Sequence, residues 1–311
     1  MKVLVTGGAG FIGSHVVNKL IGQGCRVTVV DNLSTGSVKN LNQAAAFVQL
    51  DIRSPEILQL FESEQFDAVI HLAAQTMVPK SLENPVYDSD VNIAGTLQLL
   101  EAARKTGVKR VVFSSTAAVY GNTTAVPVRE ETALQPASFY GLSKWAVERY
   151  LSLYQELYGL EYVVLRYANV YGERQGDFGE GGVISIFVRN ICGGRPVTIF
   201  GDGGQTRDFV YAGDVAAANW LALGTTAKNS IYNIGTQTES SVNLLVEELE
   251  LISGKTVEKR YKSAREGDIY RSSLCNERAV ENLNWSAQTL LKDGLARTYA
   301  SLTGVEHGCV T

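Results

Sequence analysis

The sequence has few of the residues that mark metal, disulfide or membrane proteins. Its four cysteines and three histidines are scattered, with no C-x-x-C pair and no ligand-like cluster, so we expect no metal site. We interpret the cysteines as free thiols of a reducing compartment, which predicts a cytoplasmic protein. The apolar segment after Met1 and Lys2 is too short for a signal peptide. No stretch approaches the roughly 18 consecutive apolar residues of a membrane span, so no membrane partner is expected.

The chain also lacks a strong net charge of either sign. The net charge is −4 over 311 residues, and without a basic patch we expect no nucleic-acid partner. Only six prolines are present, and we find no internal repeat or low-complexity linker. With 45% apolar and 19% charged residues, the composition is typical of a globular protein with a large buried core.

Short apolar runs alternate with helical segments through the first half of the chain. In 11–24 and 92–107, apolar residues recur at spacings of three and four, as on one face of a helix. The alternation predicts repeated βαβ units, and therefore an α/β fold with a doubly wound parallel sheet of the Rossmann type. We expect its strands at 2–6, 26–30, 47–50, 67–72, 110–115 and 161–166.

The rhythm breaks after the sixth strand, where a glycine-rich stretch occupies 172–182. We therefore expect a Rossmann domain over 1–166 and a smaller, mainly substrate-binding lobe over 167–311. An apolar run at 231–235 has the character of another strand. It indicates that a strand and a helix near 208–235 return to the first domain.

A glycine loop joins the first strand to the first predicted helix, with glycines at 7, 10 and 13. Gly7 permits a tight turn, Gly10 lets the backbone approach a pyrophosphate, and Gly13 lets the helix pack closely on the sheet. The helix N-terminus offers free amides to the phosphates. Asp31 ends the second strand about 20 residues on, where a carboxylate binds ribose hydroxyls and repels a 2′-phosphate. The loop and Asp31 together predict NAD as the cofactor.

Tyr140 and Lys144 stand four residues apart in a segment of helical period at 136–159, so both project from one face. An ammonium near a phenol favours the phenolate and lowers the pKa of the phenol, which gives a base that works near neutral pH. The spacing alone also fits an ordinary surface pair.

The motifs of the chain resemble those of the extended short-chain dehydrogenase/reductase family, and specifically its sugar-nucleotide epimerases of the UDP-glucose 4-epimerase type. The resemblance covers nearly the whole chain, and it implies that Tyr140 is the catalytic base. It implies that Lys144 holds the nicotinamide ribose and tunes Tyr140, and that Thr116 hydrogen-bonds the reacting hydroxyl. The matching motifs are TGGAGFIGSH (6–15), DNLSTG (31–36), HLAAQ (71–75), VN (91–92), GT (95–96), SSTAAVYG (114–121), YGLSK (140–144), RYANVYG (166–172), FGDGGQTRDFVYAGDVA (200–216) and REGD (265–268).

The resemblance implies further binding residues. Asn169 and Arg207 match residues that bind the substrate diphosphate, and Arg265 with Asp268 matches groups that hold the diphosphate and the uridine ribose. Substrate binding is expected for Thr116, Tyr140, Asn169, Arg207, Arg265, Asp268 and Ser272. Cofactor binding is expected for Gly7, Gly10, Phe11, Ile12, Gly13, Asp31, Asn32, Asp51, Ile52, Leu72, Ala73, Ala74, Gln75, Asn92, Ser114, Tyr140, Lys144 and Tyr167.

The residues after Thr116 favour one reaction. Dehydratases of the family carry an Asp-Glu pair there, whereas this chain has Ala117 and Ala118. Without an added acid and base, the simplest chemistry is reversible oxidation at one carbon. We therefore predict an NAD-dependent UDP-hexose 4-epimerase, in which Tyr140 deprotonates the 4-hydroxyl while hydride leaves C4 for NAD⁺. The 4-keto sugar then rotates and takes the hydride back on its opposite face.

The identity of the sugar is less constrained. Ser272 occupies the position where glucose-restricted members carry a bulky Tyr, and a one-residue shift of the alignment would place Arg271 or Ser273 there. A small residue leaves room for UDP-GlcNAc and UDP-GalNAc besides UDP-glucose and UDP-galactose. The alternatives are a UDP-glucuronate 4-epimerase or decarboxylase, with Arg174 or Arg189 binding the carboxylate, and a non-catalytic NAD-binding protein.

The resemblance also implies an oligomeric state. Helices expected at 92–107 and 140–158 match the pair that forms a four-helix interface in the family. A homodimer is therefore expected.

Overall fold

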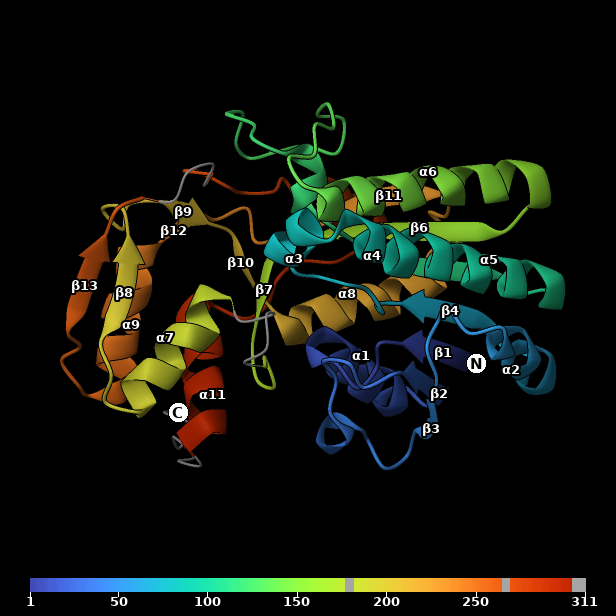
Figure 1. Cartoon of the computed structure of the whole chain (residues 1–311), viewed down its shortest axis with the longest axis horizontal. Coiled ribbons are helices and arrows are strands. Elements are labelled where there is room, and N and C mark those ends of the chain that lie inside the picture. The colour runs from blue at the N-terminus through green and yellow to red at the C-terminus, as the bar shows by residue number, and fades with distance from the viewer. Residues whose placement is uncertain (177–181, 265–268, 304–311) are drawn as a thin grey trace.

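The computed structural model describes residues 1–176, 182–264 and 269–303. A seven-stranded sheet forms the centre of its larger part, in the order β11-β6-β5-β4-β1-β2-β3, and a smaller lobe lies beside it (Figure 1). All neighbouring strands of this sheet are parallel. The strands are β1 (Lys2–Thr6), β2 (Arg26–Asp31), β3 (Ala46–Gln49), β4 (Ala68–His71), β5 (Arg110–Thr116), β6 (Glu161–Tyr167) and β11 (Ser230–Ile234). The predicted Rossmann-type parallel sheet is confirmed.

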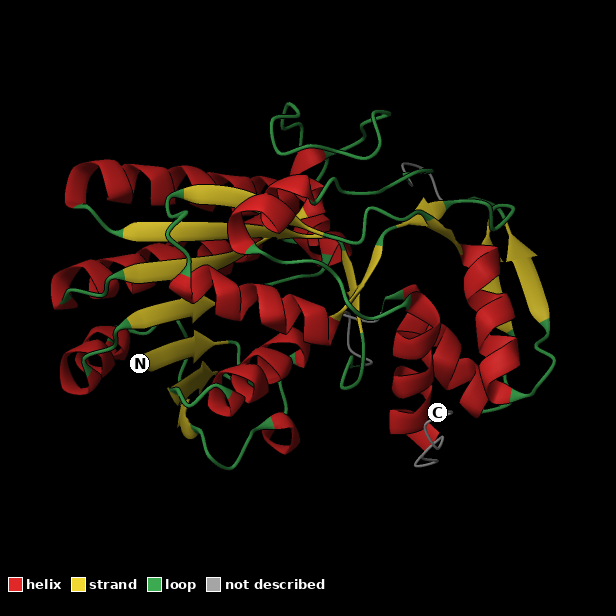
Figure 2. Ribbon diagram, turned by 180° about the vertical axis from the view of Figure 1, so that it is seen from behind, coloured by secondary structure: helices red, strands yellow, loops and turns green. Residues whose placement is uncertain are grey.

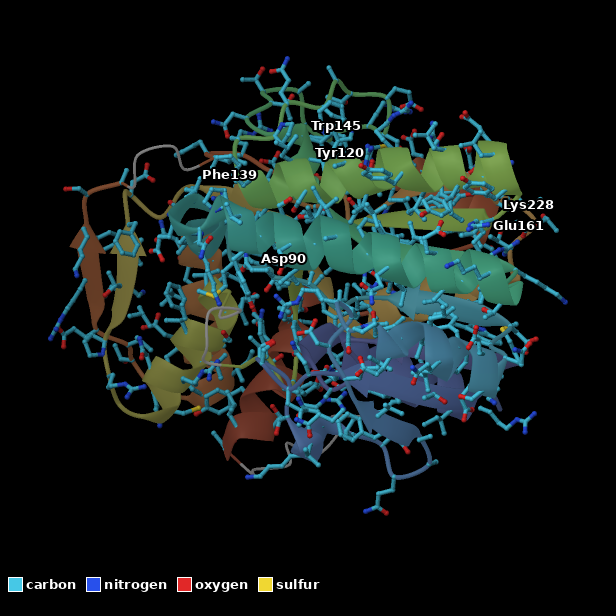
Figure 3. The ribbon with its side chains drawn as sticks, turned by 45° about the vertical axis from the view of Figure 1, so that its right-hand side comes forward. Asp90, Tyr120, Phe139, Trp145, Glu161 and Lys228 are labelled. Carbon is cyan, nitrogen blue, oxygen red and sulfur yellow. The ribbon has the colours of Figure 1, made fainter. Side chains whose placement is uncertain are left out.

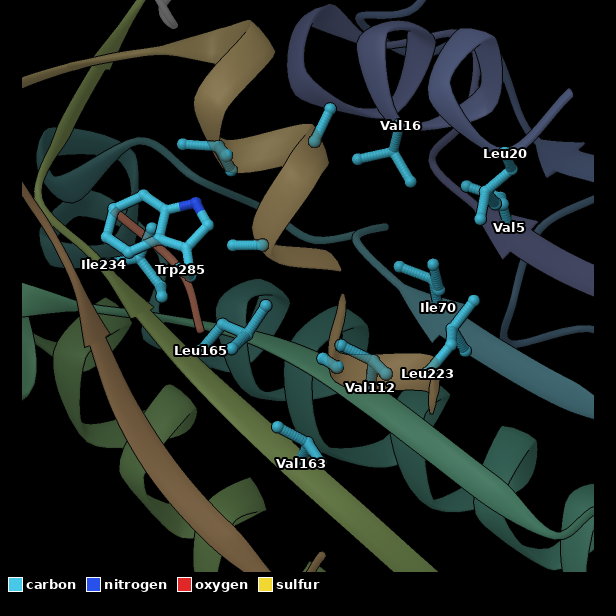
Figure 4. Close-up of a cluster of buried hydrophobic side chains, with 14 of the residues drawn as sticks. Val5, Val16, Leu20, Ile70, Val112, Val163, Leu165, Leu223, Ile234 and Trp285 are labelled. Carbon is cyan, nitrogen blue, oxygen red and sulfur yellow. The ribbon is translucent and has the colours of Figure 1, made fainter. Parts of the chain in front are cut away.

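Helices cover both faces of the sheet (Figure 2). On one face, α1 (Phe11–Gly22) and α8 (Ala212–Gly224) pack on inward-facing strand residues such as Val5 and Val163, together with Trp285 (Figure 4). On the other face, α2 (Glu56–Glu64), α5 (Gly95–Thr106) and α6 (Phe139–Tyr158) bury a second apolar cluster. Burial on both faces explains why the strands are continuous apolar runs and do not alternate.

The smaller lobe has an apolar core of its own. Its helices are α7 (Val183–Cys192), α9 (Val242–Ser253) and α11 (Leu291–Thr303), which pack beside the parallel strand pair β8 (Val197–Phe200) and β13 (Lys259–Lys262). Short elements complete the described chain: η1 (Val38–Asn40), α3 (Val78–Glu83), α4 (Pro85–Ser89), η2 (Asp90–Ala94), η3 (Ala117–Tyr120), β7 (Asn169–Tyr171), β9 (Thr206–Arg207), β10 (Phe209–Tyr211), β12 (Ser240–Ser241) and α10 (Glu277–Leu283).

The strand order places a crevice at the carboxyl ends of β1 and β4. From β1 the chain winds outward to β2 and β3, and from β4 it winds the other way to β5 and β6. Ligands of open α/β sheets bind at such a switch point. Among the described residues, no helix combines the length and apolarity that crossing a membrane requires.

Candidate active site

The loop between β1 and α1 depends on glycine at two positions. Gly7 has a left-handed backbone with φ of 72°, and a Cβ there would lie 2.7 Å from the backbone nitrogen of Ala73. A Cβ on Gly13 would lie 2.1 Å from the carbonyl oxygen of Gly7. Gly10 caps α1 without a side chain, and the first turn carries no acidic residue. The amides and the positive end of the helix dipole are therefore suited to a phosphate.

Asp31 is buried at the end of β2, and backbone amides hold both of its carboxylate oxygens. Oδ1 accepts from the Leu33 amide at 2.8 Å, and Oδ2 accepts from the Ala9 amide at 3.0 Å. Burial raises the pKa of Asp31, and the two amides oppose that rise. The carboxylate is thus fixed in orientation beside the glycine loop, as binding of a ribose requires.

A small ionic network fixes the neighbouring loop after β3. Asn32 donates to Asp51 at 2.7 Å, and Arg53 donates to both carboxylate oxygens of Asp51 at 2.9 and 2.8 Å. These bonds, led by those from Arg53, hold the pKa of Asp51 well below its usual range. Arg53 also reaches Asp90 at 2.7 Å. Asn32 and Asp51 were predicted from the sequence, whereas Arg53, which holds Asp51 in place, was not.

Three pockets follow one another along the carboxyl ends of the strands, and we name them after Asp31, Tyr140 and Ser272. The Asp31 and Tyr140 pockets share Gly7, Gly10, Leu72 and Thr76. The Tyr140 and Ser272 pockets share Thr116, Tyr167, Ala168 and Asn169. Because neighbouring pockets have walls in common, they form one continuous groove.

Nearly all predicted site residues that the structure describes line this groove. Asn92 is the exception within the described ranges, and Arg265 and Asp268 lie outside the described residues. The predicted residues found in the walls are Gly7, Gly10, Phe11, Ile12, Gly13, Asp31, Asn32, Asp51, Ile52, Leu72, Ala73, Ala74, Gln75, Ser114, Thr116, Tyr140, Lys144, Tyr167, Asn169, Arg207 and Ser272.

Thr116 and Tyr140 line one pocket because the start of α6 packs on the turn after β5. Ser138 caps α6 by accepting from the amide of Gly141 at 3.1 Å. A Cβ on Gly141 would lie 2.7 Å from the carbonyl oxygen of Ala118, so the helix touches the turn directly. Thr116 caps that turn, since its Oγ1 accepts from the Ala118 amide at 3.2 Å. Tyr140 follows in the first turn of α6 and lines the same pocket as Thr116.

Lys144 lies one turn further along α6 and is buried against β5. Its Nζ donates to the carbonyl oxygen of Ser114 at 2.9 Å and lies 4.7 Å from the centre of the Phe113 ring. Burial lowers the pKa of Lys144 to about 8, and the charges of Asp88 and Glu148 oppose the shift. The ammonium is therefore held at the base of the Tyr140 pocket, where it can stabilise a phenolate.

Asn92 lies behind the groove, in the π-helix η2, a rare element often found at functional sites. Its Oδ1 accepts from the amide of Gln75 at 2.8 Å, and its Nδ2 donates to the carbonyl of Gln75 at 3.0 Å. Nδ2 also donates to Ser143 Oγ at 3.1 Å. Asn92 thus ties the loop after β4 to α6.

His71 is buried beneath the same loop. Its Nδ1 lies 2.7 Å from Thr6 Oγ1, and its Nε2 lies 2.8 Å from Thr96 Oγ1. Burial, aided by the charge of Lys144, lowers the pKa of His71 to about 3, so the ring is neutral at physiological pH. In the described ranges no three His, Cys, Asp or Glu side chains gather as metal ligands.

The three residues considered for the position of the bulky tyrosine differ in their exposure to the Ser272 pocket. Ser272 and Arg271 both line the pocket, beside Thr116 and Arg207, whereas Ser273 is buried, and its carbonyl accepts from the Val128 amide at 2.8 Å. Arg271 forms an ion pair with Glu239. The small side chain at 272 therefore leaves space in this wall.

The two arginines considered for a sugar carboxylate are placed elsewhere. Arg189 donates to the backbone carbonyls of Gln175 and Gly176 at 3.0 and 2.8 Å. Arg174 is partly buried, and its desolvation lowers its pKa. Within the described walls of the three pockets neither side chain is present.

The same combination of sequence and fold is known from other proteins. Residues 3–235 match the model of the NAD dependent epimerase/dehydratase family. The chain belongs to this family. The resemblance inferred from its motifs is therefore confirmed.

Members of the family with similar sequences and structures carry epimerase names. A putative UDP-glucose 4-epimerase of Methanocaldococcus jannaschii is 49% identical over 296 residues, which cover 95% of this chain and 96% of that protein. The crystal structure of a Thermotoga maritima UDP-glucose 4-epimerase with UDP-glucose has a TM-score of 0.95 and 45% identity, covering 98% and 99% of the two chains. A Thermus thermophilus UDP-glucose 4-epimerase in complex with NAD has a TM-score of 0.92 and 41% identity, covering 98% and 100%.

A buried polar network next to β5 was not predicted from the sequence. Arg166 on β6 donates to both carboxylate oxygens of Glu148 on α6, at 3.0 and 2.6 Å. Ser115, the neighbour of Thr116, donates to Glu148 at 2.5 Å, and Arg166 also donates to Tyr120 Oη at 2.9 Å. The network ties β5, β6 and α6 together. Its sequence signal was weak, because Glu148 follows Lys144 by four residues, like an exposed i, i+4 pair.

Proposed function

We propose that the chain is an NAD-dependent UDP-hexose 4-epimerase. The observation that carries the proposal is the position of Tyr140, Lys144 and Thr116 in one pocket, between the Asp31 pocket and the Ser272 pocket. Ala117 and Ala118 stand where an elimination would need an acid and a base. The names of the similar proteins support the same activity.

The residues of the Asp31 pocket fit NAD. A Cβ on Gly7 or Gly13 would clash with the backbone of the loop or of the strand end beside it. The N-terminus of α1 carries no acidic residue and suits the pyrophosphate. The fixed carboxylate of Asp31 suits the adenosine ribose and disfavours a 2′-phosphate. When bound, NAD supplies reversible oxidation of the sugar at C4.

The chain's own groups handle the proton of the 4-hydroxyl. We assign Tyr140 as the base that accepts this proton and later returns it, so that no proton is gained or lost over the cycle. The Lys144 ammonium stabilises the phenolate form of Tyr140. Thr116 Oγ1 already accepts from the Ala118 amide, which leaves its hydroxyl hydrogen free to orient the sugar oxygen.

In this proposal the diphosphate of the substrate is bound tightly and the sugar is bound loosely. Arg207 and Asn169 hold the diphosphate in this proposal, and a guanidinium suits that charge because its donors form a fixed fork. The sugar lies towards Ser272, whose small side chain leaves room for the 4-keto sugar to turn and for an N-acetyl group. The positions of Arg174 and Arg189 outside the described walls disfavour the UDP-glucuronate alternatives.

Turnover tests the proposal directly. We would incubate the purified protein with UDP-glucose, UDP-GlcNAc and UDP-glucuronate separately and follow the C4 epimer by NMR. UDP-galactose from UDP-glucose is the expected result; carbon dioxide or a 4-keto-6-deoxy sugar without an epimer would refute the epimerase assignment. Tyr140→Phe should abolish turnover and keep NAD bound. Tyr261→Phe, which alters an exposed tyrosine of the smaller lobe, is the matched control.

We further propose a homodimer formed through α5 and α6. The two helices lie side by side on one flank of the molecule, where Figure 3 shows Phe139 at the start of α6 and Asp90 just before α5. Leu142, Leu153 and Leu157 are exposed along α6, which is typical of a covered apolar face. Sedimentation velocity should show a dimer that Leu153→Glu dissociates. Leu251→Glu, on the exposed side of α9, should not change the mass; a monomeric wild-type protein would contradict the proposal.

We also propose that the two parts divide the binding work. Residues 1–166, with the strand and helix near 208–235, bind NAD, and most of 167–311 binds the nucleotide sugar. The walls of the Asp31 and Ser272 pockets support this division, because Ser272 and Arg207 belong to the later segment. Substitution of Arg207 by Leu should raise the KM for the UDP-sugar and leave the NAD content unchanged. A loss of NAD instead would argue against it.

A further inference from the structure

Asp88 is a buried carboxylate for which neither the mechanism nor the motifs account. It lies in α4 and is 1% exposed. Its Oδ1 accepts from Gln75 Nε2 at 2.8 Å and from Asn92 Nδ2 at 3.2 Å. Its Oδ2 accepts no hydrogen bond from any residue that the structure describes. A buried carboxylate without a salt bridge is costly unless a positive charge lies close by.

A chain of hydrogen bonds leads from Asp88 to the catalytic tyrosine. The two hydrogens of Asn92 Nδ2 are shared among three acceptors, Asp88 Oδ1, the Gln75 carbonyl and Ser143 Oγ at 3.1 Å. Ser143 Oγ in turn donates to the backbone carbonyl of Tyr140 at 3.0 Å. Asp88 therefore fixes the orientation of the Asn92 amide, and Asn92 fixes the first turn of α6. Lys144 follows Ser143 directly, so the same contacts set its position.

Lys144 is the cation on which the charge of Asp88 acts. Asp88 is the first of two carboxylates whose charge opposes the lowering of the pKa of Lys144, and Glu148 is the second. Glu148 accepts hydrogen bonds from two nitrogens of Arg166, so its charge is already compensated. Asp88 forms no ion pair with a described residue. It is therefore the carboxylate whose charge acts on Lys144 without a cation of its own.

The other groups packed around Lys144 do not supply a negative charge at neutral pH. From β4, His71 is neutral, because burial lowers its pKa to about 3. From β5, the Phe113 ring and the Ser114 carbonyl contact the ammonium but do not titrate. From α6, Tyr140 carries a charge only in its phenolate form. The resting charge balance of the pocket thus depends on Asp88 and Lys144.

We propose that Asp88 is a positioning residue that holds the first turn of α6 through Asn92 and supplies a buried negative charge that balances the ammonium of Lys144. The inference deepens the proposed epimerase function and rests on that function for its effect on turnover. Its effect on Lys144 itself is independent of any substrate.

The sign of the effect follows from the charges. Removal of the negative charge of Asp88 destabilises the ammonium, so the pKa of Lys144 falls further below about 8. More of the lysine is then neutral at pH 8, and a neutral amine cannot stabilise a phenolate. The alkaline limb of the kcat profile should move about one pH unit lower, with a loss of roughly tenfold on that limb. The KM for the UDP-sugar should change little, because Asp88 lies outside the described walls of the Tyr140 and Ser272 pockets.

The test compares wild-type protein with Asp88→Asn, which keeps the shape and one carbonyl acceptor but removes the charge. Protein labelled with ¹³C at the lysine ε carbons is titrated by NMR, and the Lys144 resonance is assigned by its loss in Lys144→Met. The midpoint for Lys144 should fall by about one pH unit in Asp88→Asn. Glu83→Gln, which removes an exposed carboxylate at the end of α3, should leave the midpoint unchanged.

The midpoint of the Lys144 titration decides whether the proposal for Asp88 holds. An unchanged Lys144 midpoint in folded Asp88→Asn overturns the proposal, even if the variant is less stable or loses NAD. Should Asp88→Asn not fold, Asp88→Ser is measured instead, because its smaller side chain can still accept from Asn92, and the same downward shift is required. If the wild-type protein epimerises no UDP-hexose, the proposed function fails, whereas the lysine titration still tests Asp88.

Discussion

We predict that Glu148→Gln strongly destabilises the fold, because Glu148 and Arg166 form a buried ion pair. Their side chains are 3% and 2% exposed, and two hydrogen bonds of 3.0 and 2.6 Å join them. The change Glu148→Gln preserves the size of the side chain but removes its charge. The Arg166 guanidinium is then left buried without a counter-ion, next to the Tyr120 hydroxyl. A folded state with an uncompensated buried charge is strongly disfavoured.

Removal of one partner of a buried ion pair costs about 3–5 kcal/mol. The unfolding entropy of a chain of 311 residues is roughly 0.65 kcal/mol per kelvin near 60 °C, from about 2.1 cal/mol/K per residue. The melting temperature of Glu148→Gln should therefore fall by about 5–8 °C. The double variant Glu148→Leu with Arg166→Met should lose less than this, because no charge is left unpaired.

Scanning calorimetry and urea unfolding measure both quantities. Glu258→Gln is the control, because it breaks an ion pair with Arg260 whose side chains are 63% and 60% exposed, and such surface pairs contribute little. A melting temperature of Glu148→Gln that equals that of Glu258→Gln would refute the reasoning. The reasoning would also be refuted if the double variant lost as much stability as Glu148→Leu and Arg166→Met lose separately when added together. The two charges would then not be compensating each other.

Three further predictions concern the groove and the residues beneath it. Gly13→Ala should abolish NAD binding, because the new Cβ would lie 2.1 Å from the Gly7 carbonyl oxygen; Gly22→Ala, where nothing lies within 4 Å of the Cβ, should retain the NAD content measured after heat release. The ring resonances of His71 should not titrate between pH 5 and 8. Since its pKa is about 3 in the fold, the unfolded chain binds the proton first, and the free energy of unfolding should decrease as pH falls from about 6.5 towards 3; an NMR midpoint near 6.5 would contradict this. Ser272→Tyr should reduce turnover of UDP-GlcNAc at least tenfold more than turnover of UDP-glucose, as NMR of the two epimers can show; an equal reduction would remove Ser272 as the determinant.

The larger part of the fold could be predicted because its strands are buried on both faces. The centres of runs such as 2–6 and 161–166, at 3–5 and 162–165, are apolar at consecutive positions, and this pattern can be recognised without knowing which strands pair with them. The glycine loop was equally clear, since Gly7 and Gly13 are required by close backbone contacts that no other residue permits. Elements of two or three residues in the smaller region, such as β9, have no periodicity to detect.

The supporting polar residues could not be predicted, because their burial is decided by distant partners. Lys144 and Glu148 have the spacing of a solvent-exposed helix pair, yet Glu148 binds Arg166, 18 residues later in the chain. Asp88 and Asn92 likewise differ from surface residues only in what packs over them. The π-helix at Asp90–Ala94 also left no mark that separates it from the helix that follows.

The last strand of the parallel sheet, β11, is separated from its neighbour β6 in the sequence by several elements, among them α7 and β8 of the smaller lobe. β6 ends at Tyr167, and its outer neighbour β11 begins at Ser230. During synthesis the backbone groups along that edge of β6 are unpaired until some 60 further residues, which include all elements from α7 to α8, have left the ribosome. A protein cut after residue 166 would keep this open edge permanently and should associate through it. The sheet can therefore be completed only after part of the smaller lobe has been synthesised. A single recombination point in the gene could not exchange either part as a whole.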